Sequence, residues 1–558
     1  MLVIVVPALP AIAAALIAVA RPAGWSTPTA GVGERSYRWA VRAASAAFAA
    51  AIVVAVVVAV GGPFAAVVEG GDGDALVGLH ATPVTAVLAL LTTGVGLVVQ
   101  SFAGRNLQGD LRGRRFFVLA SILTASTSSV AFAATLGLLS VSWIVAGMAL
   151  TALVAHRATW LPAPLSARRT RRDLRVGDGA LLVATLLVLV SVGEIDLRSP
   201  ARAGEELANA SIPVLGGSVL PVVAVLLAVA CISRCALVPL HRWLPATIVA
   251  PTPVSALLHA GVVNGGGVLL VRLAPVFGSS AAATHVAFAA GAVTAWYATT
   301  VMLVRSDVKG NLAWSTAGQM GFMTVQVATG VFAAAVVHIV GHGMYKAALF
   351  LGAGNLVTAN LRHRQRPPPH VVARSVRLGV ALLVPAVAIA AAYLVFDPHL
   401  TTAGYVLVTV FAWATAARAV DGWLRSAPFR PVPAVATAAF GGIAGVFAYV
   451  GGLTAVETFL VPGLPTEVEV AEPVSAALLV ATIAAIALVV AVVWLAPGER
   501  MRGLRTRLYT LVLTSAPVAS PLTTRGSSTG VAPVPETRAF PTDTDAEPVR
   551  STGSVGST

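Results

Sequence analysis

The chain has 558 residues, of which 57% are hydrophobic and only 11% are charged, and its formal net charge is +14. A soluble protein of this size cannot bury so much apolar surface, so the composition excludes a water-soluble fold. The basic residues stand in the connections between apolar runs, which is typical of a membrane protein and argues against a nucleic-acid partner.

Fifteen apolar runs approach the roughly 20 residues that a helix needs to cross a bilayer. Backbone polar groups in lipid must be satisfied within the chain, so we predict an all-α, polytopic membrane helical bundle. Very short turns separate some runs, so about 13–15 transmembrane helices are expected. The expected spans are 2–20, 38–60, 81–102, 115–137, 138–156, 177–193, 212–238, 252–277, 282–304, 311–330, 331–352, 375–395, 402–420, 433–453 and 473–495.

The connections alternate in charge along the chain. Arginines dominate after odd-numbered spans and acidic residues after even-numbered ones, with Arg198 and Arg202 as the exceptions. The positive-inside rule then predicts a multi-pass protein of the cell membrane, with its N-terminus outside and its C-terminus in the cytoplasm. The first run has no cationic segment before it, so we expect a retained span. We expect residues 497–513 to lie against anionic lipid headgroups and residues 515–558 to form a disordered cytoplasmic tail.

Prolines interrupt the seventh and eighth spans. Pro239, Pro245, Pro251 and Pro253 rule out a continuous helix between Arg234 and the eighth span. A broken helix at membrane depth usually lines a water-filled site. His259 falls in the eighth span beside several glycines, and it is either part of an ion path or a structural histidine.

The seventh span carries Cys231 and Cys235, the two cysteines of the chain. Their spacing of four residues makes a disulfide unexpected, and with His241 they would give an incomplete zinc site. We therefore expect no metal in this chain.

A stripe of titratable residues lies in the run HIVGHGMYKAALF, which begins at His338. His338, His342 and Lys346 are four residues apart, so a helix places them on one face over about 12 Å. Only two of the 37 basic residues are lysines, Lys346 within this span and Lys309 at the cytoplasmic edge of another. Desolvated lysine can release a proton whereas arginine cannot, so we interpret the stripe as a proton relay. The alternative is that the histidines pack structurally against neighbouring helices.

Three motifs carry a family resemblance: PLHRW at 239–243, PTPVSALLHA at 251–260 and GQMGFM at 318–323. With the His-x3-His-x3-Lys stripe they resemble the proton-translocating antiporter-like subunits of respiratory complex I and Mrp antiporters. Within that superfamily the chain looks most like the DabB-type membrane subunits of inorganic-carbon transporters. The resemblance implies two inverted five-helix repeats. The expected parts are 1–114 (spans one to three), 115–277 (first repeat), 282–420 (second repeat), 433–495 (C-terminal spans) and 496–558 (basic segment and tail).

The resemblance also implies roles for single residues. The family's proton path matches His259, Lys309, His338, His342 and Lys346. Arg234 replaces the lysine of the seventh span, so we expect it to act as a fixed charge or electrostatic gate. The family's glutamate of the fifth span falls at Ile144, after Trp143, and no lysine stands near Pro385. These departures imply a partial proton path.

The function implied is a proton-conducting membrane subunit of an energy-coupled transporter of CO2 or bicarbonate, and not an enzyme. Its partner would be a DabA-like peripheral zinc protein resembling a β-carbonic anhydrase, with zinc in that partner and no cofactor in this chain. The coupling ion would be H+ or Na+. The alternatives are a proton-pumping subunit of a complex I-like NADH-quinone oxidoreductase, an Mrp-type cation/proton antiporter subunit, or a purely structural membrane scaffold.

Overall fold

The structure, a computed structural model, describes residues 2–19, 31–70, 75–212, 217–305, 307–353, 372–396, 403–426, 430–464 and 510. The expected span 473–495, the expected tail 515–558 and, apart from Thr510, the expected headgroup-binding segment 497–513 lie outside these residues. Everything below refers to the described part of the chain.

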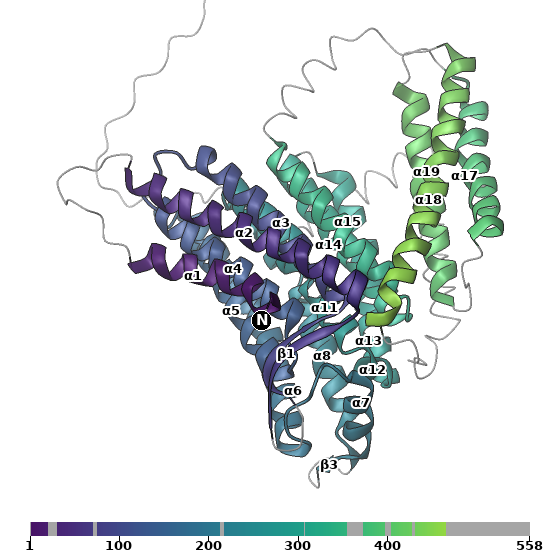
Figure 1. Ribbon diagram of the computed structural model, residues 1–558. Helices are drawn as coiled ribbons and strands as arrows, with labels where there is room; N and C mark the ends of the chain where they lie inside the picture. The colour runs from purple at the N-terminus through teal and green to yellow at the C-terminus, as the bar shows by residue number, and fades with distance from the viewer. Residues whose placement is uncertain are drawn as a thin grey trace, which may run out of the picture. The chain divides into compact units, whose positions relative to one another are not determined.

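Helices make up most of this part (Figure 1). The first half contains α1 (Leu2–Val19), α2 (Gly31–Gly61), β1 (Phe64–Glu69), β2 (Ala75–Ala81), α3 (Pro83–Asn106), α4 (Gly113–Phe132), α5 (Leu136–Val154), α6 (Pro162–Ser191), α7 (Pro200–Asn209), β3 (Ser211–Ile212), β4 (Gly217–Ser218) and α8 (Leu220–Arg234). The second half contains α9 (Trp243–Ala246), η2 (Thr247–Val249), α10 (Thr252–Ala260), η3 (Val262–Asn264), α11 (Gly265–Arg272), α12 (Ala274–Gly278), α13 (Ala281–Val304), α14 (Val308–Ala328), α15 (Phe332–Leu351), α17 (Arg374–Phe396), α18 (Ala403–Ser426), α19 (Pro431–Leu460) and η4 (Val461–Gly463).

The predicted all-α membrane bundle is confirmed. Within the described residues, eleven helices are long and apolar enough to cross a membrane. Helices α8, α14 and α18 also lie on predicted spans, so each of the first fourteen predicted spans contains a helix. The broken helices are present as well: α8 ends at Arg234, and the eighth predicted span is divided into α10, η3 and α11.

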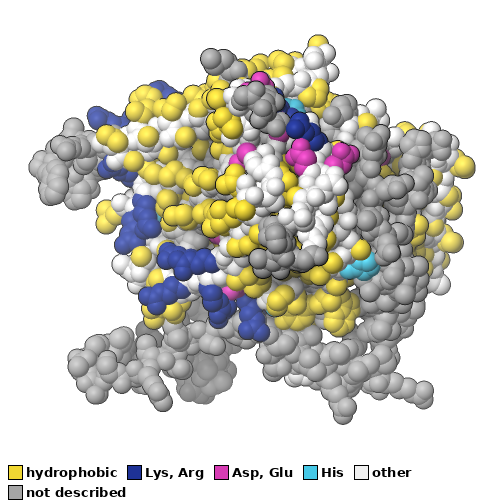
Figure 2. Space-filling model, turned by 90° about the horizontal axis from the view of Figure 1, so that it is seen from below, with side chains coloured by type: hydrophobic (Ala, Val, Ile, Leu, Met, Phe, Trp, Pro, Cys, Tyr) yellow, Lys and Arg dark blue, Asp and Glu magenta, His cyan; other side chains and the backbone are white. Residues whose placement is uncertain are grey.

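Helix α6 begins at Pro162, fifteen residues before the predicted start of its span. Its 30 residues give about 45 Å of helix, which exceeds the roughly 30 Å of a hydrocarbon core. The arginines that we expected in a loop therefore lie on its first four turns, all exposed: Arg168, Arg169, Arg171, Arg172 and Arg175. Figure 2 shows Lys and Arg side chains gathered mostly toward one side of a face that also carries broad hydrophobic areas.

Two short antiparallel hairpins were not predicted. Strands β1 and β2 pair from Phe64↔Ala81 onward, with a bulge at Val68 and Glu69. A side chain at Gly78 would lie 2.5 Å from Val67, so the close pairing of the strands requires glycine there. Arg198 fixes this hairpin to the α6–α7 connection, because its guanidinium pairs with Glu69 at 2.9 Å and with Asp196 at 2.6 Å.

The packing around α15 is what positions the candidate site. Helix α15 packs against α14, α10, α11 and α3, and α14 packs against α13. Helices α17, α18 and α19 pack on one another, and Phe411 of α18 contacts Phe322 of α14 with ring centroids 3.8 Å apart and the rings tilted by 32°. The titratable stripe of α15 therefore faces helices on several sides rather than lipid alone.

Candidate proton path

The three residues of the predicted stripe lie on one face of α15, and each finds a polar partner on α14. The Nδ1 atom of His338 is 3.0 Å from Gln326 Oε1, and the Nδ1 atom of His342 is 3.0 Å from Gln319 Oε1. The two histidine rings are 6.1 Å apart. Two facing helices on predicted membrane spans thus hold a row of successive pairs of hydrogen-bonding groups.

Lys346 ends the row. Its ammonium donates to Ser315 Oγ at 2.5 Å and to the Leu312 carbonyl at 3.3 Å, and the side chain is 1% exposed. Two neutral oxygens satisfy the ammonium without neutralising its charge. A buried cation in this setting is costly and is the kind of group that marks an ion path.

His259 lies where α10 ends, next to α15. Its ring stacks on Phe350 with centroids 4.3 Å apart, and it is 1% exposed. Among the described residues, His259 Nδ1 and His342 Nε2 are buried nitrogens without a hydrogen-bond partner. Buried polar atoms of this kind are usually satisfied by internal water, which a proton path requires.

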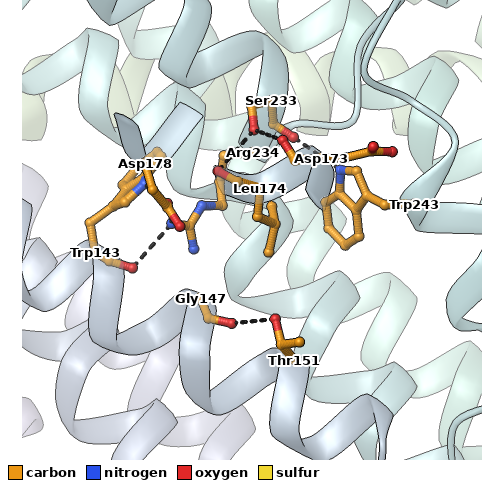
Figure 3. A network of polar contacts seen from close by, with 9 residues as sticks. All are labelled: Trp143, Gly147, Thr151, Asp173, Leu174, Asp178, Ser233, Arg234 and Trp243. Atoms are coloured by element: carbon orange, nitrogen blue, oxygen red, sulfur yellow. Dashed lines mark hydrogen bonds and ion pairs between the residues drawn. The ribbon is translucent and has the colours of Figure 1, made fainter. Parts of the chain in front are cut away.

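Helix α8 ends at Arg234. Its 15 residues span only about 22 Å, which is less than the roughly 30 Å of a hydrocarbon core, so we expect Arg234 to lie within the membrane. Its Nη2 donates to Asp178 Oδ1 at 2.8 Å and to the Trp143 carbonyl at 3.1 Å (Figure 3). Its guanidinium also stacks over the Trp143 ring at 4.1 Å, while Trp143 Nε1 donates to Asp178 Oδ1 at 3.0 Å. Arg234 is therefore the centre of a closed network drawn from α5, α6 and α8.

The end of α8 is anchored to α6 and to α9. The Ser233 hydroxyl donates to the Asp173 carbonyl at 2.7 Å, and Trp243 Nε1 donates to the Ser233 carbonyl at 3.0 Å (Figure 3). Helix α11 also packs against this network, since a Cβ added at Gly265 would be in van der Waals contact, 3.4 Å, with both Arg234 and Trp143. These contacts hold Arg234 in one place where the helix is broken.

A small cavity lies between the Arg234 network and α15. It has a volume of about 40 Å³, and Arg234, Trp143, Asn264 and Ile339 are among its lining residues. Asn264 donates to the Ala260 carbonyl at 2.9 Å, but its buried Oδ1 has no partner among the described residues. A volume of this size holds one or a few waters. The cavity therefore has room for water beside the broken helices, and it reaches α15 at Ile339.

Lys309 lies apart from the other predicted residues, in the first turn of α14. Its ammonium donates to the Ala250 carbonyl at 3.3 Å, at the end of η2. The Leu312 carbonyl that binds Lys346 is three residues further along α14. Lys309 thus occupies the end of α14 that lies nearest Lys346.

The structure adds partners that sequence reasoning missed. Asp178 of α6 places a carboxylate beside Arg234. Ser315, Gln319 and Gln326 supply the α14 side of the row. Their spacing of four and seven residues on an apolar helix was a readable signal, whereas the approach of Asp178 to Arg234 depends on packing between distant helices.

The structure also shows the state of the two cysteines. Cys231 and Cys235 are free, buried thiols with their sulfur atoms 3.9 Å apart. Within the described residues, no group of three or more His, Cys, Asp or Glu side chains is arranged to hold a metal ion.

Part of this chain is similar to a known family. Residues 133–367, which contain every residue of the predicted path, match the family "NADH:quinone oxidoreductase/Mrp antiporter, TM". The predicted resemblance to the antiporter-like superfamily is confirmed over this part of the chain. Within it, the narrower resemblance to DabB-type subunits is confirmed too.

The curated relatives include inorganic-carbon transporter subunits and NAD(P)H-quinone oxidoreductase subunits. The probable inorganic carbon transporter subunit DabB1 of Halothiobacillus neapolitanus is 34% identical over 285 residues, 51% of each chain. The chloroplastic NAD(P)H-quinone oxidoreductase subunit 5 of Nephroselmis olivacea is 32% identical over 286 residues, 50% of this chain and 43% of that one. The match spans about half the length of such relatives.

A solved structure shares the fold. The Mrp complex from Dietzia sp. DQ12-45-1b aligns with a TM-score of 0.57 at 22% identity, covering 92% of this chain and 62% of the other. At this identity the likeness concerns the fold alone.

Proposed function

We propose that the chain is a proton-conducting membrane subunit of an energy-coupled inorganic-carbon transporter. The observation that carries this proposal is the row from His338 to Lys346, in which each of the three titratable α15 side chains has a hydrogen-bonding partner on α14. The similarity to DabB subunits supports the choice of inorganic carbon as the cargo.

In this mechanism the chain's own residues bind, pass and release protons. His338, His342 and Lys346 exchange protons along the row, and His259 joins them from α10. Lys309 connects the row to the side that the charge pattern predicts to be cytoplasmic. Arg234 keeps its proton, so with Asp178 it acts as a fixed charge pair beside the path and not as a carrier.

The partner in this proposal is a DabA-like peripheral zinc protein resembling a β-carbonic anhydrase. It would hydrate CO2 to bicarbonate, and ion flow through this subunit would make that hydration directional. The zinc is assigned to the partner. The transporter subunit itself is not an enzyme, and its coupling ion is H+ in preference to Na+ because the row consists of proton-exchanging side chains.

The test is uptake of labelled inorganic carbon in cells that lack carbonic anhydrase. The chain is expressed alone, with its genomic neighbour, and with that neighbour plus an uncoupler. Uptake that needs both proteins and collapses with the uncoupler supports the proposal. Absence of uptake by a correctly inserted and assembled complex overturns it.

A second function is favoured by the similarity to NAD(P)H-quinone oxidoreductase subunit 5 and by the fold shared with an Mrp complex. In that case the same row would pump protons in a redox complex or exchange them for a cation. Copurification with a quinone-reducing module, or with small Mrp-type subunits, would identify this alternative.

A further inference from the structure

Beyond His338, the face of α15 that carries the stripe runs on toward the end of the helix that is predicted to be extracellular. The next position four residues back is Ala334, which cannot carry a proton. Tyr405 of α18 packs there, against the cluster of Val331, Ala334 and Val408. The neighbouring helix thus brings a polar side chain to a place where the stripe has none.

Gly404 makes this approach possible. A Cβ added at Gly404 would lie 2.4 Å from Val331 Cγ2 and 2.6 Å from Thr329 Oγ1, so only glycine fits. Thr329 in turn donates to the Gln326 carbonyl at 3.1 Å, and the Gln326 side chain binds His338. A run of polar groups therefore leads from His338 to the start of α18.

Tyr405 is paired with a carboxylate. Its hydroxyl donates to Glu457 Oε1 of α19 at 2.5 Å, and both side chains are half-buried. In the described parts of α17, α18 and α19 the acidic residues are Asp421 and Glu457. Asp421 is held by Arg377 at 2.8 Å and Arg425 at 2.7 Å, whereas Glu457 has no basic partner among the described residues.

We propose that Glu457, with Tyr405, is a proton-binding site at which protons enter the row; this proposal rests on the proposed proton conduction. The Glu457 carboxylate takes a proton from external water and becomes a carboxylic acid. That proton passes to the Tyr405 hydroxyl, which gains one proton as it gives up another, and on through bridging water to the neutral His338 imidazole. The imidazole becomes imidazolium, and the Glu457 carboxylate is restored.

The other titratable groups on the packed helices include Tyr393 on α17, which binds Thr409, Tyr449 on α19 itself, and His338 on α15, the nearest member of the stripe. The other carboxyl group in the described parts of α17, α18 and α19 is Asp421, which two arginines hold. A half-buried carboxyl without a cationic partner is a group whose charge state can change during transport.

The first test compares transport by variants of the full chain, expressed with its partner. We expect Glu457→Gln to lower uncoupler-sensitive uptake by about 100-fold, the lower end of what positioned proton-transfer groups contribute. Tyr405→Phe should lower it less, and Glu457→Asp should retain part of it. The control is Glu205→Gln, which removes an exposed carboxylate on α7, also on the predicted extracellular side. Full uptake by Glu457→Gln beside an active unsubstituted chain overturns the site and leaves the proposed function standing.

The second test does not depend on transport. Infrared difference spectra of membranes containing the full chain are recorded between acidic and alkaline buffer. We expect a carboxylic-acid band that disappears in Glu457→Gln, shifts in Tyr405→Phe and is unchanged in Glu205→Gln. Identical spectra for the unsubstituted chain and Glu457→Gln overturn the site, whatever the cargo of the transporter.

Discussion

Lys346 is the residue on which the proposed path depends most, because it is a fully buried lysine bound by two neutral oxygens. We expect Lys346→Ala to lower uncoupler-sensitive uptake by about 100-fold. Lys346→Arg should not restore it, since arginine keeps its proton. Tyr345→Phe is the control, because Tyr345 is the neighbouring residue but is 57% exposed. Normal uptake by Lys346→Ala, at normal protein levels, would show that Lys346 carries no proton.

A second prediction at the scale of residues concerns the Arg234–Asp178 pair. Arg234→Gln leaves the Asp178 carboxylate without its cation, so we expect a loss of about 3–5 kcal/mol in the free energy of unfolding. Asp178→Asn should cost a similar amount. The double variant should cost clearly less than the sum, because no charge is then left unpaired. Unfolding of the purified chain in detergent measures all three, and strictly additive losses would show that the two residues are not coupled.

Single residues also show how far the sequence predicts this site. The spacing of His338, His342 and Lys346 is enough to place them on one face, because residues four positions apart lie on the same side of a helix. The spacing of Ser315, Gln319 and Gln326 also places them on one face of α14, but whether that face meets α15 depends on how the two helices pack. Asp178 was missed for the same reason, because its contact with Arg234 joins residues 56 positions apart.

At the scale of elements, the loops between helices have interactions of their own. The α3–α4 connection is joined to the end of α5, because Asp110 Oδ2 lies 2.9 Å from His156 Nε2 and Asp110 Oδ1 accepts from the Arg112 backbone N–H at 2.7 Å. Burial alone would raise the pKa of the Asp110 carboxyl, but these hydrogen bonds hold it below its ordinary value.

This lowered pKa predicts how stability depends on pH. A carboxyl whose pKa is lower in the folded state contributes stability above its unfolded pKa of about 3.9, and the contribution is lost as the pH falls through the folded pKa. We expect Asp110→Asn to lower the free energy of unfolding by about 0.5–1.5 kcal/mol at neutral pH. The difference from the unsubstituted chain should shrink as the pH falls below about 4 and disappear once the pH is below the folded pKa of Asp110. Unfolding curves at neutral and acidic pH test this, and equal stability at neutral pH would contradict it.

Two elements differ from the sequence prediction: helix α6 begins earlier than predicted, and the β1–β2 hairpin was not predicted. Hydropathy finds the apolar part of a helix, and it placed the start of α6 at residue 177 because the turns before it carry five arginines. The hairpin was not predicted because its strands are short and lie between two spans. Strand pairing there depends on a glycine contact and on ion pairs to a distant connection, so it follows from tertiary packing.

At the scale of the whole molecule, the charge pattern of the connections predicts the orientation in the membrane. The two native cysteines are free and fully buried, so they give no labelling background in the folded chain. Arg171 on α6 and Glu205 on α7 are both exposed, on opposite predicted sides. We expect an impermeant maleimide, added to intact cells, to label Glu205→Cys and not Arg171→Cys.

The control for this experiment is permeabilised cells, in which both variants should be labelled to the same extent. The reverse pattern in intact cells would place the N-terminus in the cytoplasm. It would then put Lys309 at the outer end of the row and Glu457 at the inner end, so the direction of proton flow in the proposed function would have to be inverted. Equal labelling of both variants in sealed cells would mean that the chain inserts in two orientations, which a single vectorial path does not allow.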